Sequence, residues 1–400
     1  MSQVETSASR DGSAVLQHEA IKVIVFSHNL DYEGASISLK ELVVELFCRR
    51  VINPEIVTFA DGPLRSEYVS QGISVQVVPG MGYKASSLNR LSIEIDRLVL
   101  LMRGVELVLA NTLLSFIAVL AAERANVPSV WIIRESESWD QYFRFLPDPV
   151  AQRAIAAIGL PRKVVFAAHA TRAVWDCFDT HHSFNVIHNG IDLDRFPLRT
   201  DAAERRRCRG ELGVHPDSIV ILSVGTLCDR KNQIDLVDAF VMLPQAIVNR
   251  VQILLVGDDR GGYANALKKR CHSLSTNAKE RIRIVPATES VATYYAAADL
   301  FILSSKVESF PRVVLEAMAF GLPIITTPVF GVLEQVVEGE NALFYPPGDS
   351  RLLAEQIKYV VRDEACRLRM AESSRQRISQ MTTFDEMIAA YASISREAVS

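Results

Sequence analysis

Short runs of β-branched and apolar residues alternate along the chain with stretches in which apolar residues recur at helical spacing. The first example is KVIVFSH (22–28), which is followed by a polar loop and then by SISLKELVVELFCRR. Strands that are buried on both faces of a sheet and joined by crossover helices have this pattern. The alternation therefore predicts parallel sheets covered by helices, which is an α/β fold.

The alternation is interrupted once, and the interruption predicts two domains. The stretch NVIHNGIDLDRFPLRT (185–200) is rich in turn-forming residues, and the pattern restarts after it with SIVILSVG. We expect two Rossmann-like, doubly wound domains that face a cleft, residues 21–190 and 191–375. Residues 1–20 are expected to form a disordered leader, and a helix at 376–400 to pack back towards the N-terminal domain.

Composition narrows the class of protein. The chain has 49% hydrophobic and 22% charged residues, and a net charge of −4 gives no general attraction to nucleic acid. Six cysteines are scattered without a C-x-x-C pair, which favours reduced thiols in the cytoplasm. No apolar run approaches the ~20 residues that span a bilayer, so we expect a cytoplasmic protein. Peripheral contact with the inner face of a membrane stays open, because RRRCR (205–209) is either a solvated helix face or a site for anionic lipid.

The stretch VESFPRVVLEA (307–317) follows the predicted strand DLFILSS and contains Glu308 and Glu316, with seven residues between them. Pro311 suits the first turn of a helix, because its missing N–H has no partner there, and Gly321 is expected to end that helix. Ligands of an open parallel sheet bind beyond the carboxyl ends of its strands, and the free N–H groups of a helix start favour an anion such as a diphosphate.

The two glutamates then flank an anion-binding helix start. Ionised carboxylates only accept hydrogen bonds, so their expected partners are hydroxyl groups on either side of the phosphates, as on a ribose and a hexose. The alternative is structural: Glu308 stabilises the helix through its dipole, and Glu316 lies on a solvated face.

A second predicted strand and helix start lie in SVGTLCDRKNQIDLVDAF. A turn at Gly225 precedes a helix expected near Lys231, and Arg230 and Lys231 place two cations at that turn. Both cations can neutralise a diphosphate. The alternative is that they are solvated or paired with Asp229.

These motifs together resemble a known family. ESFPRVVLEAMAFGLPIITT, VGTLCDRKN, IHNGID and PPGD are similar in order and spacing to the retaining GT-B glycosyltransferases of family four, the group 1 type. The resemblance covers most of residues 21–395 and is strongest in the second half. It implies a GT-B fold and a metal-independent hexosyltransferase without a cofactor. The implied donor is a nucleotide-diphosphate sugar, and the implied acceptor is a glycan, a lipid-linked saccharide or a small molecule.

The resemblance also implies roles for single residues. Glu316 accepts from the nucleotide ribose, Glu308 lies near the transferred sugar, and Lys231 binds the diphosphate. Gly34 lets the N-terminal domain approach the diphosphate closely, as its missing side chain also suggests. Backbone groups in the glutamate motif hold sugar hydroxyls or phosphate, at Ser309, Phe310, Arg312 and Val313.

Three positions depart from the family pattern. Thr226 follows Gly225 where the family usually has arginine, and we expect neighbouring Arg230 to supply the missing charge. Pro311 stands where many members have glycine, which removes a backbone donor beside the donor sugar. Many members also end an N-terminal strand on a histidine that contacts this sugar, whereas this chain offers Arg134 and Glu135. Either of these two residues can contact a sugar hydroxyl, and Arg134 can equally be a structural ion-pair partner.

Histidines offer weaker signals. His28 follows the first strand and is either a sugar contact in the cleft or a packing residue. His181, His182 and His188 have no spacing with carboxylates that predicts a metal site. We therefore expect a retaining hexosyltransferase of glycan, lipid-linked saccharide or small-glycoside biosynthesis. The alternatives are a GT-B nucleotide-sugar epimerase and a non-catalytic module that binds sugar nucleotides.

Overall fold

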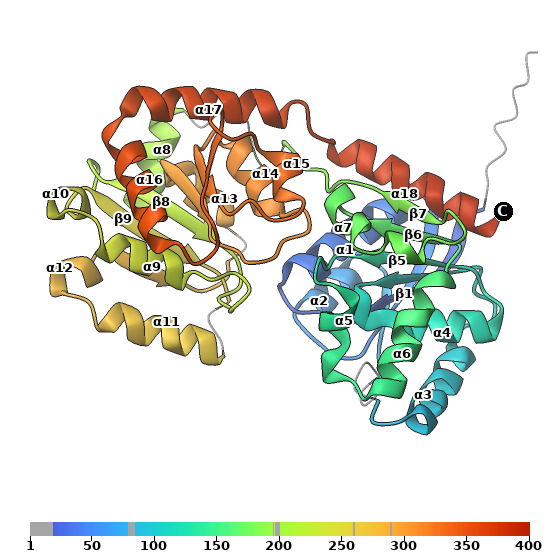
Figure 1. The fold of residues 1–400 in the computed structure, drawn as a ribbon. Helices are drawn as coiled ribbons and strands as arrows, with labels where there is room; N and C mark the ends of the chain where they lie inside the picture. The colour runs from blue at the N-terminus through green and yellow to red at the C-terminus, as the bar shows by residue number, and fades with distance from the viewer. Residues whose placement is uncertain (1–18, 79–84, 195, 197–200, 259–260, 289) are drawn as a thin grey trace, which may run out of the picture.

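The computed structural model describes residues 19–78, 85–194, 196, 201–258, 261–288 and 290–400. The leader expected at residues 1–20 lies outside the described residues, apart from its last two positions. The predicted α/β class is confirmed, because the chain forms two parallel sheets with helices packed on both (Figure 1).

The first half folds around a seven-stranded sheet in the order β3-β2-β1-β4-β5-β6-β7. Every neighbouring pair is parallel, and β1 runs beside β2 from Ile21 opposite Ile52 to Ser27 opposite Thr58. The central strands are almost wholly apolar because helices cover both faces. The strands are β1 (Ile21–Ser27), β2 (Ile52–Thr58), β3 (Ser74–Val77), β4 (Leu107–Asn111), β5 (Ser129–Ile133), β6 (Lys163–Phe166) and β7 (Phe184–Val186).

The second half repeats this plan with a six-stranded parallel sheet in the order β10-β9-β8-β11-β12-β13. Its strands are β8 (Ile219–Val224), β9 (Val251–Val256), β10 (Ile282–Val285), β11 (Leu300–Leu303), β12 (Ile324–Thr326) and β13 (Ala342–Phe344).

The helices follow the strands in crossover order. Those of the first half are α1 (Gly34–Cys48), α2 (Leu64–Ser70), α3 (Leu88–Leu101), α4 (Phe116–Ala125), α5 (Trp139–Tyr142), α6 (Asp148–Ala156) and α7 (His169–Ala173). Those that follow are α8 (Ala202–Glu211), α9 (Ile234–Val241), α10 (Gln245–Val248), α11 (Gly262–His272), α12 (Thr276–Lys279), α13 (Val291–Ala297), α14 (Arg312–Ala319), α15 (Val332–Gln335), α16 (Ser350–Arg362), α17 (Glu364–Ile378) and α18 (Phe384–Val399).

The strand order reverses at one point in each sheet, between β1 and β4 and between β8 and β11. In open α/β sheets, the crevice at this switch point is where ligands bind. The loops after β1, β4, β8 and β11 all border the cleft between the two halves.

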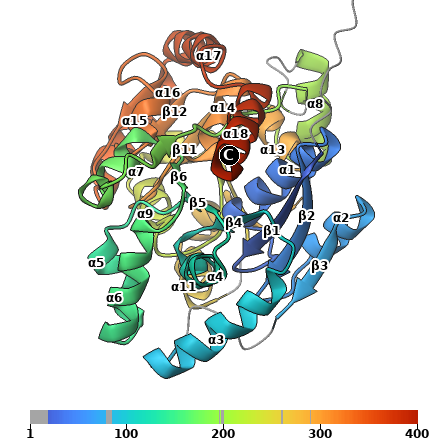
Figure 2. The same cartoon turned by 90° about the vertical axis from the view of Figure 1, so that its right-hand side faces the viewer.

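The last helix returns to the first half. The apolar side of α18 joins the core formed by β1 and α1, with Met387, Ile388, Tyr391, Ala392, Ile394 and Ala398 buried there. Figure 2 views α18 nearly along its axis, above the first sheet. Helix α17 runs through residue 375, so the return segment starts after α17 and not at 376 as expected.

The chain therefore passes between the two halves twice, at neighbouring places. Ile191 on the outward path forms a bridge with Thr383 on the return path. Gly190 has no room for a side chain, because an added Cβ would lie 2.3 Å from the carbonyl oxygen of Thr383. Thr383 and Glu386 form a capping box at the start of α18, which fixes where the helix begins.

Candidate active site

A cavity of about 990 Å³ lies between the two halves of the molecule. Every residue that the sequence analysis proposed for the donor and sugar site lines it. These residues are His28, Gly34, Arg134, Glu135, Thr226, Arg230, Lys231, Glu308, Ser309, Phe310, Pro311, Arg312, Val313 and Glu316. The sequence thus placed its candidates in one cleft, and what each residue does there depends on its contacts.

Glu308 is a buried carboxylate held by two cations. Its Oε1 lies 2.5 Å from Lys231 Nζ and accepts from Ser305 Oγ at 2.6 Å, and its Oε2 lies 3.4 Å from an Arg230 nitrogen. Burial alone would raise the pKa of Glu308, but Lys231, Arg230 and these hydrogen bonds lower it below its ordinary value. Two cations against one carboxylate leave the surroundings of Glu308 suited to an anion.

Glu316 lies on the cleft side of α14 and is 9% exposed, so the structural alternative, a solvated face, is wrong for this residue. Its Oε2 accepts a hydrogen bond from the buried hydroxyl of Tyr295 at 2.8 Å. Burial and the charge of Glu316 raise the pKa of Tyr295, which keeps the phenol protonated as a donor. Tyr295 orients a carboxylate that faces the cavity, and sequence spacing gave no sign of it.

Helix α14 starts as predicted, with Pro311 as the residue before Arg312 and Gly321 beyond the end at φ 65°. Helix α9 does not, because it begins at Ile234 and not near Lys231. Asn232 adopts a left-handed φ of 51°, which places Lys231 in a turn before the helix. Lys231 therefore reaches Glu308 from a loop. Of the two helix starts that the sequence predicted beside the site, that of α14 lies inside the glutamate motif, whereas α9 starts three residues after Lys231.

The glutamate motif also touches the N-terminal domain. Ser309 Oγ lies 2.9 Å from Thr171 Oγ1, and the carbonyl of Phe310 accepts from Asn189 Nδ2 at 2.8 Å. Arg312 reaches across to α1, where its Nη1 lies 2.5 Å from Glu41 Oε2. The segment that would hold the donor sugar is thus fixed from both sides of the cleft.

Arg134 and Glu135 take different roles. Arg134 donates to Asn111 Oδ1 at 2.8 Å and to Asn189 Oδ1 at 3.3 Å, so its guanidinium braces the path between the domains. Glu135 Oε2 accepts from the backbone of Leu113 and of Arg134, at 3.1 and 3.0 Å. Burial raises the pKa of Glu135 despite these donors.

His28 is held by neighbours on both ring nitrogens. Its Nε2 lies 2.5 Å from Glu33 Oε1, and its Nδ1 lies 3.3 Å from Thr112 Oγ1. Gly34 begins α1, and an added Cβ there would meet no protein atom within 4 Å. The protein's own packing therefore does not require glycine at this position.

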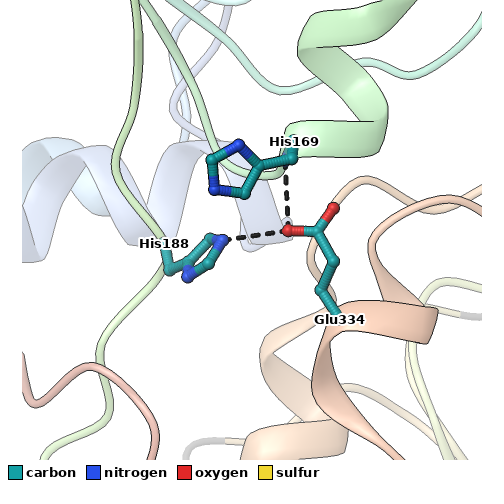
Figure 3. A group of neighbouring side chains, drawn as sticks. All are labelled: His169, His188 and Glu334. Atoms are coloured by element: carbon teal, nitrogen blue, oxygen red, sulfur yellow. Dashed lines mark hydrogen bonds and ion pairs between the residues drawn. The ribbon is translucent and has the colours of Figure 1, made fainter.

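A separate group of polar side chains joins the domains outside the cavity. Figure 3 shows Glu334, on α15, between His169 at the start of α7 and His188 after β7. Glu334 accepts from the backbone N–H groups of His169 and Ala170 at 3.1 and 2.8 Å, and His188 Nε2 lies 3.0 Å away. His188 also stacks on Phe310, with ring centres 4.6 Å apart.

These three residues have side chains that can ligate a metal, and their ligand atoms lie within 4.8 Å of one another. The sequence did not predict this group, because its members are far apart along the chain. Both oxygens of Glu334 already accept hydrogen bonds from protein donors, so we interpret the group as a link between the domains.

The basic stretch on α8 is largely neutralised. Arg205 and Arg209 pair with Asp299, and Arg207 pairs with Glu204 and Glu211. These pairs favour the solvated-face interpretation over lipid binding. Among the described helices, none has the length and apolar character needed to cross a membrane.

The two facing Rossmann-like domains and their interdomain cleft define the GT-B fold. HepE from Anabaena, whose crystal structure contains UDP and glucose, shares this fold with a TM-score of 0.81, at 22% identity, over 94% of this chain and 99% of that one. Residues 204–377 match the model of the family glycosyl transferases group 1, which confirms the resemblance seen in the sequence.

Curated relatives match part of the chain. A D-inositol 3-phosphate glycosyltransferase of Xylanimonas cellulosilytica is 29% identical over 54% of this chain and 51% of its own length. An N-acetyl-alpha-D-glucosaminyl L-malate synthase of Bacillus anthracis is 26% identical over 52% of each chain. The chain thus spans about half the length of these relatives in the matches.

Proposed function

We propose that the protein is a retaining glycosyltransferase that moves a hexose from a nucleotide-diphosphate sugar to an acceptor hydroxyl, without a metal or another cofactor. The observation that carries this proposal is the Glu308, Lys231 and Arg230 cluster beside the start of α14, at the switch point of the second sheet. Retention of configuration rests on the resemblance to the retaining family. The UDP bound to HepE supports a uridine nucleotide as the first donor to test.

The proposed chemistry is a displacement at the anomeric carbon of the donor hexose. The bond from this carbon to the diphosphate oxygen breaks, and a bond to the acceptor oxygen forms on the same face. The acceptor's proton passes to the departing phosphate. Lys231, Arg230 and the first N–H groups of α14 stabilise the charge on the leaving diphosphate, because fixed donors act best where charge develops.

The glutamates position the donor in this proposal. Glu316, oriented by Tyr295, accepts from the ribose hydroxyls, and Glu308 holds a hydroxyl of the hexose. Arg230 takes over the charge that the family usually places after Gly225. The position of Arg230 supports that role, because its guanidinium lies 3.4 Å from the Glu308 carboxylate that Lys231 also contacts.

A panel of nucleotide sugars tests the donor, with binding measured by calorimetry and products identified by mass spectrometry. Binding of one donor, followed by transfer only when an acceptor is added, is the expected result. Epimerised or released sugar without an acceptor would favour the epimerase, and binding without turnover would favour a non-catalytic module.

Gly34→Ala tests the position of the diphosphate, because the added methyl group meets no protein atom. We expect the melting temperature to stay the same or rise, while the affinity for a nucleoside diphosphate falls at least tenfold. Gly210→Ala is the matched control. An added Cβ at Gly210 also meets no protein atom within 4 Å, and Gly210 lies on α8 outside the cleft. Unchanged affinity in Gly34→Ala would remove the proposed approach of α1 to the diphosphate.

A further inference from the structure

The N-terminal wall of the cleft carries an excess of carboxylates. Five glutamates of that domain line the cavity, against two cations, Lys40 and Arg134, among the described residues. The glutamates are Glu33, Glu41, Glu67, Glu135 and Glu137. In the proposed transferase this wall faces the acceptor, apart from the start of α1 at Gly34, because the donor cluster lies on the opposite domain.

Neither cation is directed to an acceptor. Lys40 Nζ lies 2.8 Å from Glu67 Oε2, which pairs α1 with α2. Arg134 points to Asn111 and Asn189, as described above. The other lysine and arginine residues that line the cavity among the described residues are Arg230, Lys231 and Arg312. The donor diphosphate occupies Arg230 and Lys231 in the proposed complex, and Arg312 is paired with Glu41.

In the part of the chain that the structure describes, three carboxylates on this wall have no pair with lysine or with Arg312: Glu33, Glu135 and Glu137. Glu33 contacts His28, and Glu135 accepts hydrogen bonds from the backbone of Leu113 and Arg134. Glu33 lies after β1, and Glu135 and Glu137 lie after β5.

Arg230 lines the same cavity. Burial alone would lower the pKa of Arg230, but the charges of Glu308, Cys228, Glu137 and Glu135 raise it. Burial alone would raise the pKa of Glu33, but His28, Asn29 and the charge of Arg230 lower it.

The rest of the wall suits a polyhydroxyl ligand. Tyr32 and Tyr142 also line the cavity, and aromatic side chains with a few hydrogen-bonding groups are typical of sites for small molecules. Carboxylates accept from hydroxyl and ammonium groups but repel phosphate and carboxylate groups.

We propose, resting on the transferase function above, that the acceptor is an uncharged or amino sugar, and that Glu33, Glu135 and Glu137 exclude acceptors that carry a phosphate or carboxylate next to the reacting hydroxyl. This separates the chain from relatives whose names specify inositol 3-phosphate or malate, and which match only about half of it.

The test uses acceptors in matched sets: a glycoside, the same glycoside with a phosphate on a neighbouring hydroxyl, and its 2-amino analogue. With the donor found by calorimetry, we expect kcat/KM for the uncharged and amino glycosides to exceed that for the phosphorylated one at least tenfold. Glu137→Lys should reduce this ratio at least fivefold, and Glu137→Gln should reduce it less.

Glu123→Lys is the control for total charge, because Glu123 is an exposed residue of α4 outside the cavity. Its ratio should match the wild type. Saturation-transfer NMR on the complex with nucleoside diphosphate reports acceptor binding without turnover. Preference for the phosphorylated glycoside, a ratio unaffected by Glu137→Lys, or binding of neither class would overturn the inference. Failure of every nucleotide sugar to bind would instead overturn the proposed function.

Discussion

Single residues in the cleft act through partners that lie far away in the sequence. Glu308, Lys231 and Glu316 were predictable as candidates, because strand, turn and helix-start signals surround them. Their partners were not: Tyr295 orients Glu316, and Glu41 pairs with Arg312, without any local pattern that links them. Sequence spacing reports neighbours on one helix or strand, whereas these contacts depend on how separate elements pack.

The pairing of Glu308 predicts a dependence of stability on pH. Its folded pKa is lowered from 4.5, so its stabilising contribution is complete above that value and is lost as the pH falls through the folded pKa. Replacing it by glutamine leaves Lys231 without its partner, and we expect Glu308→Gln to lower the free energy of unfolding by about 3 kcal/mol at pH 7.

Urea unfolding of both proteins between pH 3 and 7 measures this difference. It should shrink as the pH falls below 4.5 and through the lowered pKa of Glu308, because the wild-type carboxylate then becomes protonated. Glu340→Gln, at an exposed position of the same domain, should change stability little at any pH in the range. A difference of the same size at pH 3 and pH 7 would show that the ion pairs do not stabilise Glu308.

At the scale of elements, the alternation of strands and helices predicted both sheets, because buried parallel strands have a distinctive apolar composition. The start of α9 was placed wrongly, since the left-handed conformation of Asn232 has no clear signal in the sequence. Contacts between elements of different domains were also invisible, and α1 with α14 is the clearest case.

The pair of Glu41 on α1 and Arg312 on α14 should couple these helices energetically. Both side chains are more than four-fifths buried, so the pair is screened less than a surface ion pair. We expect Glu41→Gln and Arg312→Gln, measured singly and together by chemical unfolding, to give a coupling energy of about 1–3 kcal/mol. The pair Arg65 and Asp61 is exposed and should give a clearly smaller coupling energy. Strictly additive effects of the Glu41 and Arg312 substitutions would mean that the contact does not tie the domains.

At the scale of the molecule, the C-terminal helix α18 completes the core of the N-terminal domain. The sequence analysis expected a terminal helix that packs back towards the N-terminal domain, and α18 lies there. The amphipathic pattern alone shows that a helix has an apolar side and not which surface covers that side. Ile388 is fully buried in that core, whereas Leu368 on α17 is 64% exposed.

Ile388→Ala should therefore cost about 2–5 kcal/mol and loosen the first half of the molecule, although the residue is near the end of the chain. Hydrogen exchange should become faster in β1 and β4, while amides of β8 and β11 should change little. Leu368→Ala serves as the control and should leave both sheets protected. Faster exchange confined to the second sheet would contradict the assignment of α18 to the first core.

The return of α18 has a consequence for the order in which the protein can be made. The ribosome releases the N-terminal half long before it translates Ile388 and Tyr391. The apolar surface that α18 covers in the folded protein is therefore exposed while the second half is synthesised. We expect the nascent chain to expose this apolar surface to chaperones in that interval. The same arrangement means that expressing residues 21–190 alone would yield an aggregation-prone piece, whereas supplying α18 as a separate peptide should restore its solubility.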